Sequence, residues 1–366
     1  MKINKISFQN YRNLKDGTLE PIEGVNIICG NNAQGKTNLL ESMWLFTGGK
    51  SFRGSKDSEL TTFGEKFTQL ETESYIQERT QKLKIEIKSG KRAVEINKVP
   101  QPHPSALVGK LCAVAFSPVH LSLIKDGPGL RRRFLDTAIC QIKPMYTKHL
   151  LKYNHILNQR NVLLRTIKKS KNLIETLDIW EENLSICASE IISQRISYTE
   201  KLKNLSQQFY NGLSLEKETL KITYRSSINK EIVNEKEVIK KELKKKLEET
   251  REDDIALGFT TKGPHRDDLE VKIDGKSARM YASQGQQRSA VLAMKLAEAE
   301  IVDYTCKEAP IVLLDDVLSE LDRGRQNYLL NSISNKQIFI TCCEEELEKR
   351  FSSGKIFKVS NGEIIY

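Results

Sequence analysis

One short segment restricts the possible folds of this chain more than any other. Residues 30–37 read Gly-Asn-Asn-Ala-Gln-Gly-Lys-Thr and match the pattern G-x-x-x-x-G-K-[ST] at every fixed position. An apolar run, Val25–Cys29, precedes the segment, and a helix-forming stretch, Asn38–Trp44, follows it. In a strand–loop–helix unit of this kind, the glycines let backbone N–H groups and the helix N-terminus surround a phosphate group. The sequence therefore predicts a loop that binds the phosphates of a nucleotide.

Each position of this loop has an expected role. We expect Lys36 to reach the β- and γ-phosphates of ATP and Thr37 to ligate Mg²⁺. The remaining residues are expected to line the phosphates with their backbone, namely Gly30, Asn31, Asn32, Ala33, Gln34 and Gly35.

A second run supplies the carboxylate that such a loop needs. The four apolar residues Ile311–Leu314 are followed directly by Asp315 and Asp316. An apolar run of this length is typical of a buried central strand, and an acid at its end holds Mg²⁺ in P-loop enzymes. We expect Asp315 to hold the metal through water and Asp316 to orient the attacking water. ABC-type ATPases usually have a glutamate at the second position, so the shorter side chain of Asp316 predicts weak hydrolysis.

The segment between these two motifs resembles the signature of ABC-type ATPases. It reads Ala-Ser-Gln-Gly-Gln-Gln-Arg over residues 282–288 and leads into a helix-forming stretch. Alone, the pattern could be an ordinary helix N-cap, but its position just before the acidic strand favours the signature in its S-x-G-Q form. In this class the signature contacts the nucleotide of the opposite subunit, which implies that Ser283, Gly285 and Gln286 act across a dimer.

Two further positions resemble ABC-type motifs. Ser319–Asp322 resembles the D-loop, so Asp322 is expected to face a partner subunit. Thr341 ends the last apolar run where many ABC-type ATPases have a histidine, and it is expected to take part of that role. No glutamine can be assigned to the Q-loop.

The spacing of apolar residues changes along the chain and distinguishes segments expected to form strands from segments expected to form helices. The alternation of Leu83–Ile87, a turn at Ser89–Gly90, and renewed alternation at Val94–Ile96 predict a hairpin. Apolar positions spaced by three and four over residues 146–164 and 173–209 predict two long helices packed as an antiparallel hairpin near 144–213. For the shorter first segment, an ordinary core helix is the alternative. The balanced charges of residues 235–254 predict a solvated helix with i,i+4 pairs, one face of which carries Val238, Leu243 and Leu247.

These patterns and motifs predict an α/β fold, with an ABC-type P-loop ATPase head and an inserted arm. We expect the head to comprise residues 1–125 and 255–366, and the mainly helical arm to comprise residues 126–254.

The net charge and the composition indicate which kind of partner the protein binds and in which compartment it works. The formal charge is +10 and the pI is about 9.1, which favours a polyanion such as DNA. No apolar stretch approaches the ~18 residues of a membrane span, and the start of the chain lacks the apolar core of a signal peptide. We expect a cytoplasmic protein without membrane contact. The seven cysteines include no C-x-x-C pair, and we expect them to act as reduced, small apolar residues.

Four segments together resemble the RecF family. Residues 8–14 are similar to the opening of SMC-like heads and RecF, and residues 116–136, 262–269 and 314–322 resemble RecF-specific stretches. The resemblance extends along the whole chain. It implies an SMC-like head that forms a dimer around two ATP molecules and binds DNA in recombinational repair. It also implies action with RecO and RecR at single-strand gaps and single-strand–duplex junctions, where RecA recombinase is loaded, including during the SOS response.

The same resemblance leaves several roles open. Arg12 is either a nucleotide contact or an exposed arginine in a turn. Arg131, Arg132 and Arg133 either touch DNA or cap a helix, and successive residues of a helix cannot all face one side. His265 follows a glycine–proline pair, which favours a structural or interface role over catalysis.

Other functions compatible with a P-loop are less well supported. An ATPase subunit of a membrane transporter would not explain the RecF-like segments or the helical arm. A nuclease-associated ATPase would need its metal-dependent cleavage site in another protein. A scaffold without activity would not need Lys36, Thr37, Asp315 and Asp316 together.

Overall fold

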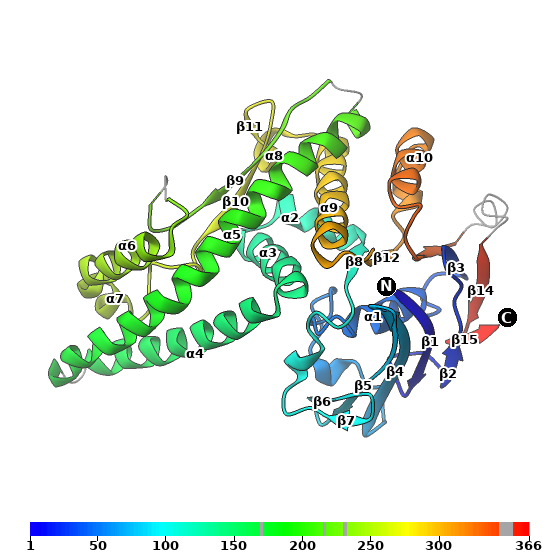
Figure 1. The fold of residues 1–366 in the computed structure, drawn as a ribbon, viewed down its shortest axis with the longest axis horizontal. Helices are drawn as coiled ribbons and strands as arrows, with labels where there is room; N and C mark the ends of the chain where they lie inside the picture. Colours follow the sequence, from blue (N-terminus) through cyan, green and yellow to red (C-terminus); the bar gives the residue numbers. More distant parts are fainter. Residues whose placement is uncertain (169–170, 215–216, 230–232, 344–353, 366) are drawn as a thin grey trace. The chain divides into compact units, whose positions relative to one another are not determined.

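The computed structural model describes residues 1–168, 171–214, 217–229, 233–343 and 354–365 (Figure 1). The chain forms two compact units. The first unit comprises Met1–Leu121, Gln208–Glu216 and Arg288–Tyr366, and the second comprises Ser122–Gln207 and Lys217–Gln287. The phosphate loop and the two acids therefore belong to the first unit, whereas Ser283, Gly285 and Gln286 belong to the second.

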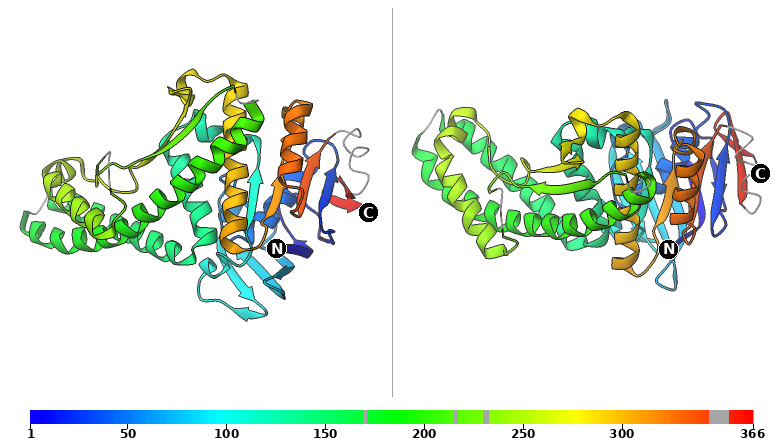
Figure 2. Two further views of the ribbon diagram at one scale, coloured as in Figure 1. Left: turned by 45° about the horizontal axis from the view of Figure 1, so that its top comes forward. Right: turned by 90° about the horizontal axis from the view of Figure 1, so that it is seen from above.

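The first unit contains a largely parallel sheet. Its strands lie side by side in the views of Figure 2. Every neighbouring pair is parallel except the edge pair β14 and β15. The strand order is β15 (Glu363–Ile365), β14 (Lys355–Ser360), β3 (Val25–Cys29), β13 (Ile338–Cys342), β12 (Ile311–Leu314) and β8 (Ala113–Phe116). All residues of β8, β12 and β13 are buried, as expected for central parallel strands with both faces covered.

A second sheet of the first unit is wholly antiparallel. Its order is β2 (Gly17–Leu19), β1 (Lys2–Gln9), β4 (Phe67–Ile76), β5 (Arg79–Lys88), β6 (Lys91–Ile96) and β7 (Val99–Pro100). The predicted hairpin is confirmed, because β5 pairs with β6. Ser89 and Gly90 in its turn have φ angles of 51° and 72°, and positive φ at both positions fits the twist of a two-residue hairpin.

Helix α1 (Lys36–Leu45) lies between these two sheets (Figure 1). Leu39, Leu40 and Met43 are fully buried in one apolar cluster that also contains Ile6 of β1 and Phe339 of β13. The helix that follows the phosphate loop is therefore fixed from both sides. The other helices of this unit are η1 (Asp57–Glu59), η2 (Pro104–Leu107), η3 (Pro118–Leu121), most of α9 (Gln284–Cys306), η5 (Leu318–Glu320) and α10 (Arg323–Ser332).

The second unit is mainly helical. Its long helices are α3 (Pro128–Ile142), α4 (Pro144–Ile167) and α5 (Leu177–Ser214), the last of which ends in the first unit. Shorter helices are α2 (Ser122–Lys125), η4 (Lys171–Thr176), α6 (Lys236–Glu249), α7 (Arg251–Leu257) and α8 (Ala278–Tyr281), and β9 (Leu220–Arg225), β10 (Asp268–Ile273) and β11 (Lys276–Ser277) form an antiparallel sheet. Among the described residues, no helix is long and apolar enough to cross a membrane.

Helices α4 and α5 run antiparallel. Arg160 of α4 donates to Glu181 of α5 at 2.8 Å, whereas Arg195, further along α5, donates to Tyr146 near the start of α4 at 3.2 Å. Near the connection between the two helices, Leu164, Ile167 and Leu177 form an apolar cluster. These two helices occupy the segments in which the apolar spacing predicts long helices.

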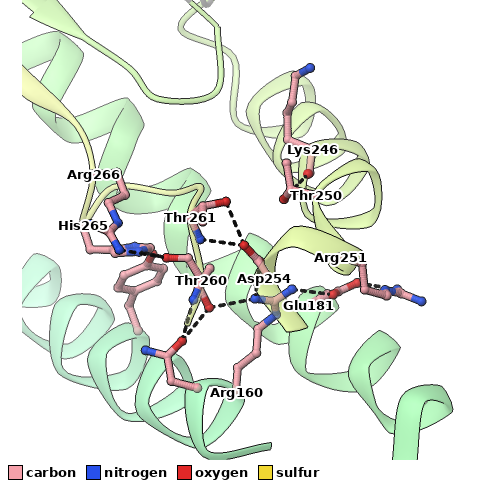
Figure 3. Close-up of polar contacts among 12 residues, drawn as sticks. Arg160, Glu181, Lys246, Thr250, Arg251, Asp254, Thr260, Thr261, His265 and Arg266 are labelled. Atoms are coloured by element: carbon pink, nitrogen blue, oxygen red, sulfur yellow. Dashed lines mark hydrogen bonds and ion pairs between the residues drawn. The ribbon is translucent and has the colours of Figure 1, made fainter. Parts of the chain in front are cut away.

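A buried arginine organises the polar core of the second unit (Figure 3). Arg160 is fully buried and donates to Asp254 at 2.7 Å and to Thr260 at 2.7 Å, in addition to its bond with Glu181. Arg251 of α7 also donates to Glu181. A buried charge is tolerated only when it is paired, and here the partners of Arg160 come from other elements. The network therefore links α4, α5 and α7 through electrostatic contacts as well as apolar packing.

The predicted helix at 235–254 differs in detail from the structure. It is divided at Thr250 into α6 and α7, and the buried face of α6 carries Ile239 with Leu243 and Leu247, not Val238. Ile239, Leu243 and Leu247 follow one another at intervals of four residues and therefore lie on the same face of the helix. Most of the ion pairs made by lysines of α6 are also not i,i+4 pairs within the helix. Three of these lysines bind glutamates of α5: Lys236 binds Glu190, and both Lys240 and Lys244 bind Glu182.

The compact units also divide the chain differently from the expected head and arm. Residues 255–287 fall in the second unit, whereas the sequence places them in the head. The reason is strand pairing: β10 pairs along its whole length with β9, from Asp268 opposite Arg225 to Ile273 opposite Leu220.

Candidate nucleotide-binding site

Side chains with potential chemistry gather where parallel strands of the first unit end. The phosphate loop follows β3, Asp315 follows β12, and Ser117 follows β8. Since β12 pairs in parallel with both β8 and β13, the residues after these strands lie at the same edge of the sheet. The carboxyl edge of a parallel sheet is where α/β proteins bind their ligands.

Two glycines fix the shape of the loop. Gly30 has φ 154°, and a Cβ atom there would lie 2.2 Å from the carbonyl oxygen of Val359. Gly35 has φ 114°, and its Cβ would lie 2.5 Å from Leu14. A side chain at either position would therefore collide with its surroundings as well as strain the backbone. Glycine at both positions therefore lets the loop pack closely against Val359 and Leu14 in this conformation.

Lys36 is held within the curve of this loop. Its Nζ donates to the carbonyl oxygens of Gly30 at 2.6 Å and Asn31 at 3.1 Å, and to Cys343 Sγ at 3.0 Å. Only 5% of the residue is exposed. The ammonium group is thus placed at the mouth of the loop, where a phosphate oxygen would meet it.

Three hydroxyl groups surround the carboxylate of Asp315. Thr37 donates to Asp315 Oδ1 at 2.7 Å, Thr341 Oγ1 lies 3.3 Å from the same oxygen, and Ser117 Oγ lies 3.3 Å from Oδ2. Burial raises the pKa of Asp315, and the negative charge of Asp316 adds to this, while the three hydroxyl contacts act in the opposite direction. A hydroxyl and a carboxylate in contact form the oxygen donor set that suits Mg²⁺.

Asp316 is oriented by Thr341. Its φ angle is 52°, a left-handed conformation that aspartate tolerates better than most residues, and its N–H donates to Thr341 Oγ1 at 2.8 Å. Thr341 therefore touches both acids. The sequence places Thr341 at a strand end near the acids, but Ser117 is not among the predicted site residues. Its signals are its position directly after the apolar run 111–116 and its place in the RecF-like stretch 116–136.

Arg12 forms an ion pair that neither sequence alternative anticipates. Its Nε donates to Glu41 Oε2 at 2.9 Å and its Nη2 donates to Glu41 Oε1 at 3.0 Å and to Ser55 Oγ at 2.8 Å. Glu41 lies on α1 and is fully buried, and Tyr11 donates to it as well. Arg12 is therefore not an exposed turn residue. It connects the first strand to the helix that follows the phosphate loop.

The signature-like residues begin helix α9 in the second unit. Ser283 Oγ accepts from the N–H of Gln286 at 3.2 Å, and the Gln286 side chain accepts from the N–H of Ser283 at 2.7 Å. This reciprocal pair is a capping box, which satisfies the backbone N–H groups of Ser283 and Gln286 at the start of the helix. A Cβ at Gly285 would meet only Ser283 Oγ, at 3.9 Å, so another molecule can approach the backbone here.

Asp322 caps helix α10 of the first unit. Its side chain accepts from the N–H of Arg325 at 3.0 Å, and this backbone bond is the main cause that lowers the pKa of Asp322. The side chain remains mostly exposed, so the cap and a contact with another subunit are compatible.

The arginine run and His265 have structural contacts within the second unit. Arg131 binds both carboxylate oxygens of Asp268, at 2.7 and 3.0 Å, and Arg132 donates to the carbonyl of Asp267 at 2.7 Å, whereas Arg133 is exposed. His265 contacts Tyr153 through Nδ1 at 2.6 Å and the carbonyl of Thr260 through Nε2 at 3.0 Å. Burial lowers the pKa of His265 to about 4.

The fold and this arrangement of residues define an ABC-type P-loop ATPase. The AAA ATPase domain family matches residues 1–301. The chain is 39% identical to "DNA replication and repair protein RecF" of Acetivibrio thermocellus over 100% of both proteins. It is 40% identical to the protein of the same name from Lachnoclostridium phytofermentans, over 100% of this chain and 99% of that relative. The chain belongs to the RecF family.

Solved structures agree with this assignment. The structure of the recombination mediator protein RecF with ATP in the RecFOR pathway superimposes with a TM-score of 0.93 at 37% identity, covering 100% of this chain and 97% of that chain. An Smc head domain derived from Pyrococcus furiosus, bound to the C-terminal domain of ScpA, has a TM-score of 0.56 at 15% identity, covering 100% of this chain and 96% of that chain. The second likeness concerns the fold alone and confirms the predicted SMC-like head.

Proposed function

We propose that this protein is an ATP-dependent DNA-binding protein of recombinational repair, which dimerises on ATP and helps to load RecA recombinase at single-strand gaps and single-strand–duplex junctions. The observation that carries the proposal is the 2.7 Å contact of Thr37 with Asp315 beside the phosphate loop, in a chain of the RecF family. The names of the relatives refer to DNA replication and repair, and a similar solved structure belongs to the RecFOR pathway. RecR and RecO are the corresponding partners, in the cytoplasm.

The residues of the first unit fit ATP and Mg²⁺. ATP supplies a phosphoanhydride bond whose hydrolysis can drive a change of state. Lys36 exchanges its carbonyl contacts for phosphate oxygens, while Thr37 and Asp315 provide oxygen ligands for the metal. Asp316 orients the attacking water, with its backbone anchored by Thr341, and its short side chain accounts for slow turnover.

The dimer supplies the remaining contacts. Ser283, Gly285 and Gln286 of a second copy meet the γ-phosphate at the N-terminus of α9, and Asp322 faces that copy. The first unit and the start of α9 form this ATP-dependent contact, and the mainly helical second unit extends the surface available to DNA. Arg12 supports the nucleotide site through Glu41 of α1. The net charge of +10 favours DNA binding through backbone phosphates, with little dependence on base sequence.

One experiment tests this function directly. Binding to a labelled gapped duplex is measured with ATP, with ADP and with neither, while light scattering reports the mass of the protein. We expect dimers and tight, salt-sensitive DNA binding with ATP only. Lys36→Arg, which keeps the positive charge, should bind ATP without hydrolysing it and should remain a DNA-bound dimer for longer. An ATP-bound monomer, or DNA binding that ignores the nucleotide, would contradict the proposal.

A further inference from the structure

Two thiols that are far apart in the sequence lie in contact at the base of the phosphate loop. Cys29 is the last residue of β3 and Cys342 is the last residue of β13, and their sulfur atoms are 3.1 Å apart. The two residues are direct register partners in neighbouring parallel strands. Both are buried, with exposures of 5% and 2%, and they share an apolar cluster with Ile27.

The backbone geometry is compatible with a covalent bond between these sulfurs. Neighbouring strands lie about 4.8 Å apart, within the roughly 4.4–6.8 Å range of Cα separations found in disulfides. Register partners direct their side chains to the same face of a sheet, so no strand has to rotate. The sulfur atoms need to approach by about 1 Å to reach a bond length of about 2.05 Å.

We propose that Cys29 and Cys342 form a reversible disulfide, which makes the nucleotide-binding site sensitive to oxidation. The sequence gives no sign of this pair, because the two cysteines become neighbours only through strand order. Disulfides in reducing compartments, where they occur, are usually transient and often sense the redox state. The effect on ATP rests on the proposed function, whereas formation of the bond does not.

The position of the pair explains how such a bond would affect the site. Cys29 directly precedes Gly30, whose Cα has no free space on the side of Val359. Cys342 is flanked by Thr341, which touches both acids, and by Cys343, whose sulfur accepts from Lys36 and donates to Asn32 Oδ1 at 3.0 Å. Bringing the two sulfur atoms about 1 Å closer therefore shifts the start of the loop beside Cys29 and the contact of Cys343 with Lys36.

A peroxide is the oxidant that fits a buried pair, because it is small. The thiol sulfur of Cys29, the more exposed of the two, attacks one peroxide oxygen. An S–O bond forms, the O–O bond breaks, and the leaving hydroxide takes the thiol proton and departs as water. The Cys342 sulfur then attacks the sulfenic acid: the S–S bond forms, the S–O bond breaks, and a second water leaves. Two thiols are oxidised and one hydrogen peroxide is reduced to two waters. A dithiol reductant reverses the reaction by thiol–disulfide exchange.

The chain offers a matched control. The thiols of Cys112 and Cys306 also hydrogen-bond to each other in the first unit, but neither residue adjoins the phosphate loop or the strand end at Cys342. Cys306→Ala removes this second pair. Cys342→Ala removes the proposed site, with Cys29→Ala as a second variant that removes the same bond from the other strand. Cys343→Ala separates the proposed bond from direct oxidation of the exposed cysteine beside Lys36.

The experiment treats the full-length protein with hydrogen peroxide and follows two readouts. Peptide mapping by mass spectrometry detects the peptides joined through Cys29 and Cys342, and a fluorescent ATP analogue gives the nucleotide affinity. We expect the joined peptides, and ATP binding weakened by about tenfold and restored by dithiothreitol. Cys306→Ala should behave like the wild type, and Cys343→Ala should still give the joined peptides and lose affinity relative to its own reduced form. Cys342→Ala and Cys29→Ala should keep their affinity after oxidation.

The two readouts separate failure of this inference from failure of the proposed function. Absence of the joined peptides after peroxide treatment would overturn the disulfide. Joined peptides with unchanged ATP affinity would show that the disulfide forms but does not affect nucleotide binding, which would overturn that part of the proposal. If the reduced protein itself failed to bind ATP, the proposed function would fall, and the peptide map alone would still decide whether the disulfide forms.

Discussion

A single carboxylate, Asp315, gathers hydroxyl groups from three separate segments of the chain. Thr37 comes from the start of α1, Thr341 from β13, and Ser117 from the residue after β8. Each contact orders an oxygen that would otherwise turn freely. The carboxylate is thus positioned before any metal arrives, which reduces the entropy that binding has to overcome.

Arg12 gives the clearest prediction at the scale of one residue. Arg12→Ala would leave the fully buried Glu41 without its bidentate partner, so we expect the free energy of unfolding to fall by about 3–5 kcal/mol. Urea denaturation measures this change. Arg53→Ala is the control. Arg53 is exposed, and its side chain donates to Asn38 on the surface, so its effect should stay within about 0.5 kcal/mol. Unchanged stability with weaker ATP binding would instead identify Arg12 as a direct nucleotide contact.

The site residues that sequence can predict are those with fixed spacing along the chain. Gly30 to Thr37 form a contiguous motif, and Asp315 directly follows a recognisable strand. Ser117 and the partner of Cys29 could not be predicted, because both depend on which strands lie side by side. The order β3, β13, β12, β8 does not follow the order along the chain.

At the scale of elements, the spacing of apolar residues predicts where helices and strands form. The positions of charged residues predict less well which elements pack against each other. The hairpin of β5 and β6 follows from alternation and a turn, yet β4, which pairs along the whole of β5, has no comparably clean signal in Phe67–Ile76. In α6, the sequence shows where lysines and glutamates stand but not whether they pair within the helix. Lys240 and Lys244 both bind Glu182 of α5, so these lysines pair with another helix and not within α6.

The loop at 258–267 gives a prediction about pH. The pKa of His265 is lowered to about 4 by burial, while in the unfolded chain it returns to about 6.5. Below pH 6.5 the unfolded state therefore binds a proton that the folded state excludes. The stability contributed by neutral His265 is complete above pH 6.5 and is lost progressively as the pH falls to about 4, by up to ~3 kcal/mol.

The measurement is the difference between wild type and His265→Gln in urea denaturation at pH 7.5 and pH 5. The wild type should lose more stability between these two values than the variant does. This difference isolates His265 from other groups such as His120, whose pKa burial lowers to about 3. His155→Gln, at an exposed position of α4, should keep the wild-type pH dependence. Equal pH dependence of wild type and His265→Gln would contradict the buried, neutral histidine.

At the scale of the whole molecule, the functional motifs are divided between two compact units. The phosphate loop and both acids lie in the first unit, and Ser283 and Gly285 lie in the second. Lys36 and Asp316 must therefore act in the same copy of the chain. Ser283, in the proposed dimer, serves the nucleotide of the other copy. This division predicts which pairs of inactive variants can restore each other.

Mixing variants tests the division directly. Asp316→Ala lacks the residue proposed to orient water, and Ser283→Arg is expected to block the nucleotide of the partner, so each variant alone should hydrolyse little ATP. In a mixed dimer, one site combines Lys36 and Asp316 of the Ser283→Arg copy with Ser283 of the Asp316→Ala copy, and this site is intact. With random pairing, half of the dimers carry one working site of two, so hydrolysis should recover to roughly a quarter of the wild-type rate. Mixing Asp316→Ala with Lys36→Arg is the control, because both changes act on a copy's own nucleotide and no intact site can form. Recovery in that control, or none in the first mixture, would show that Ser283 does not act on the nucleotide of another copy.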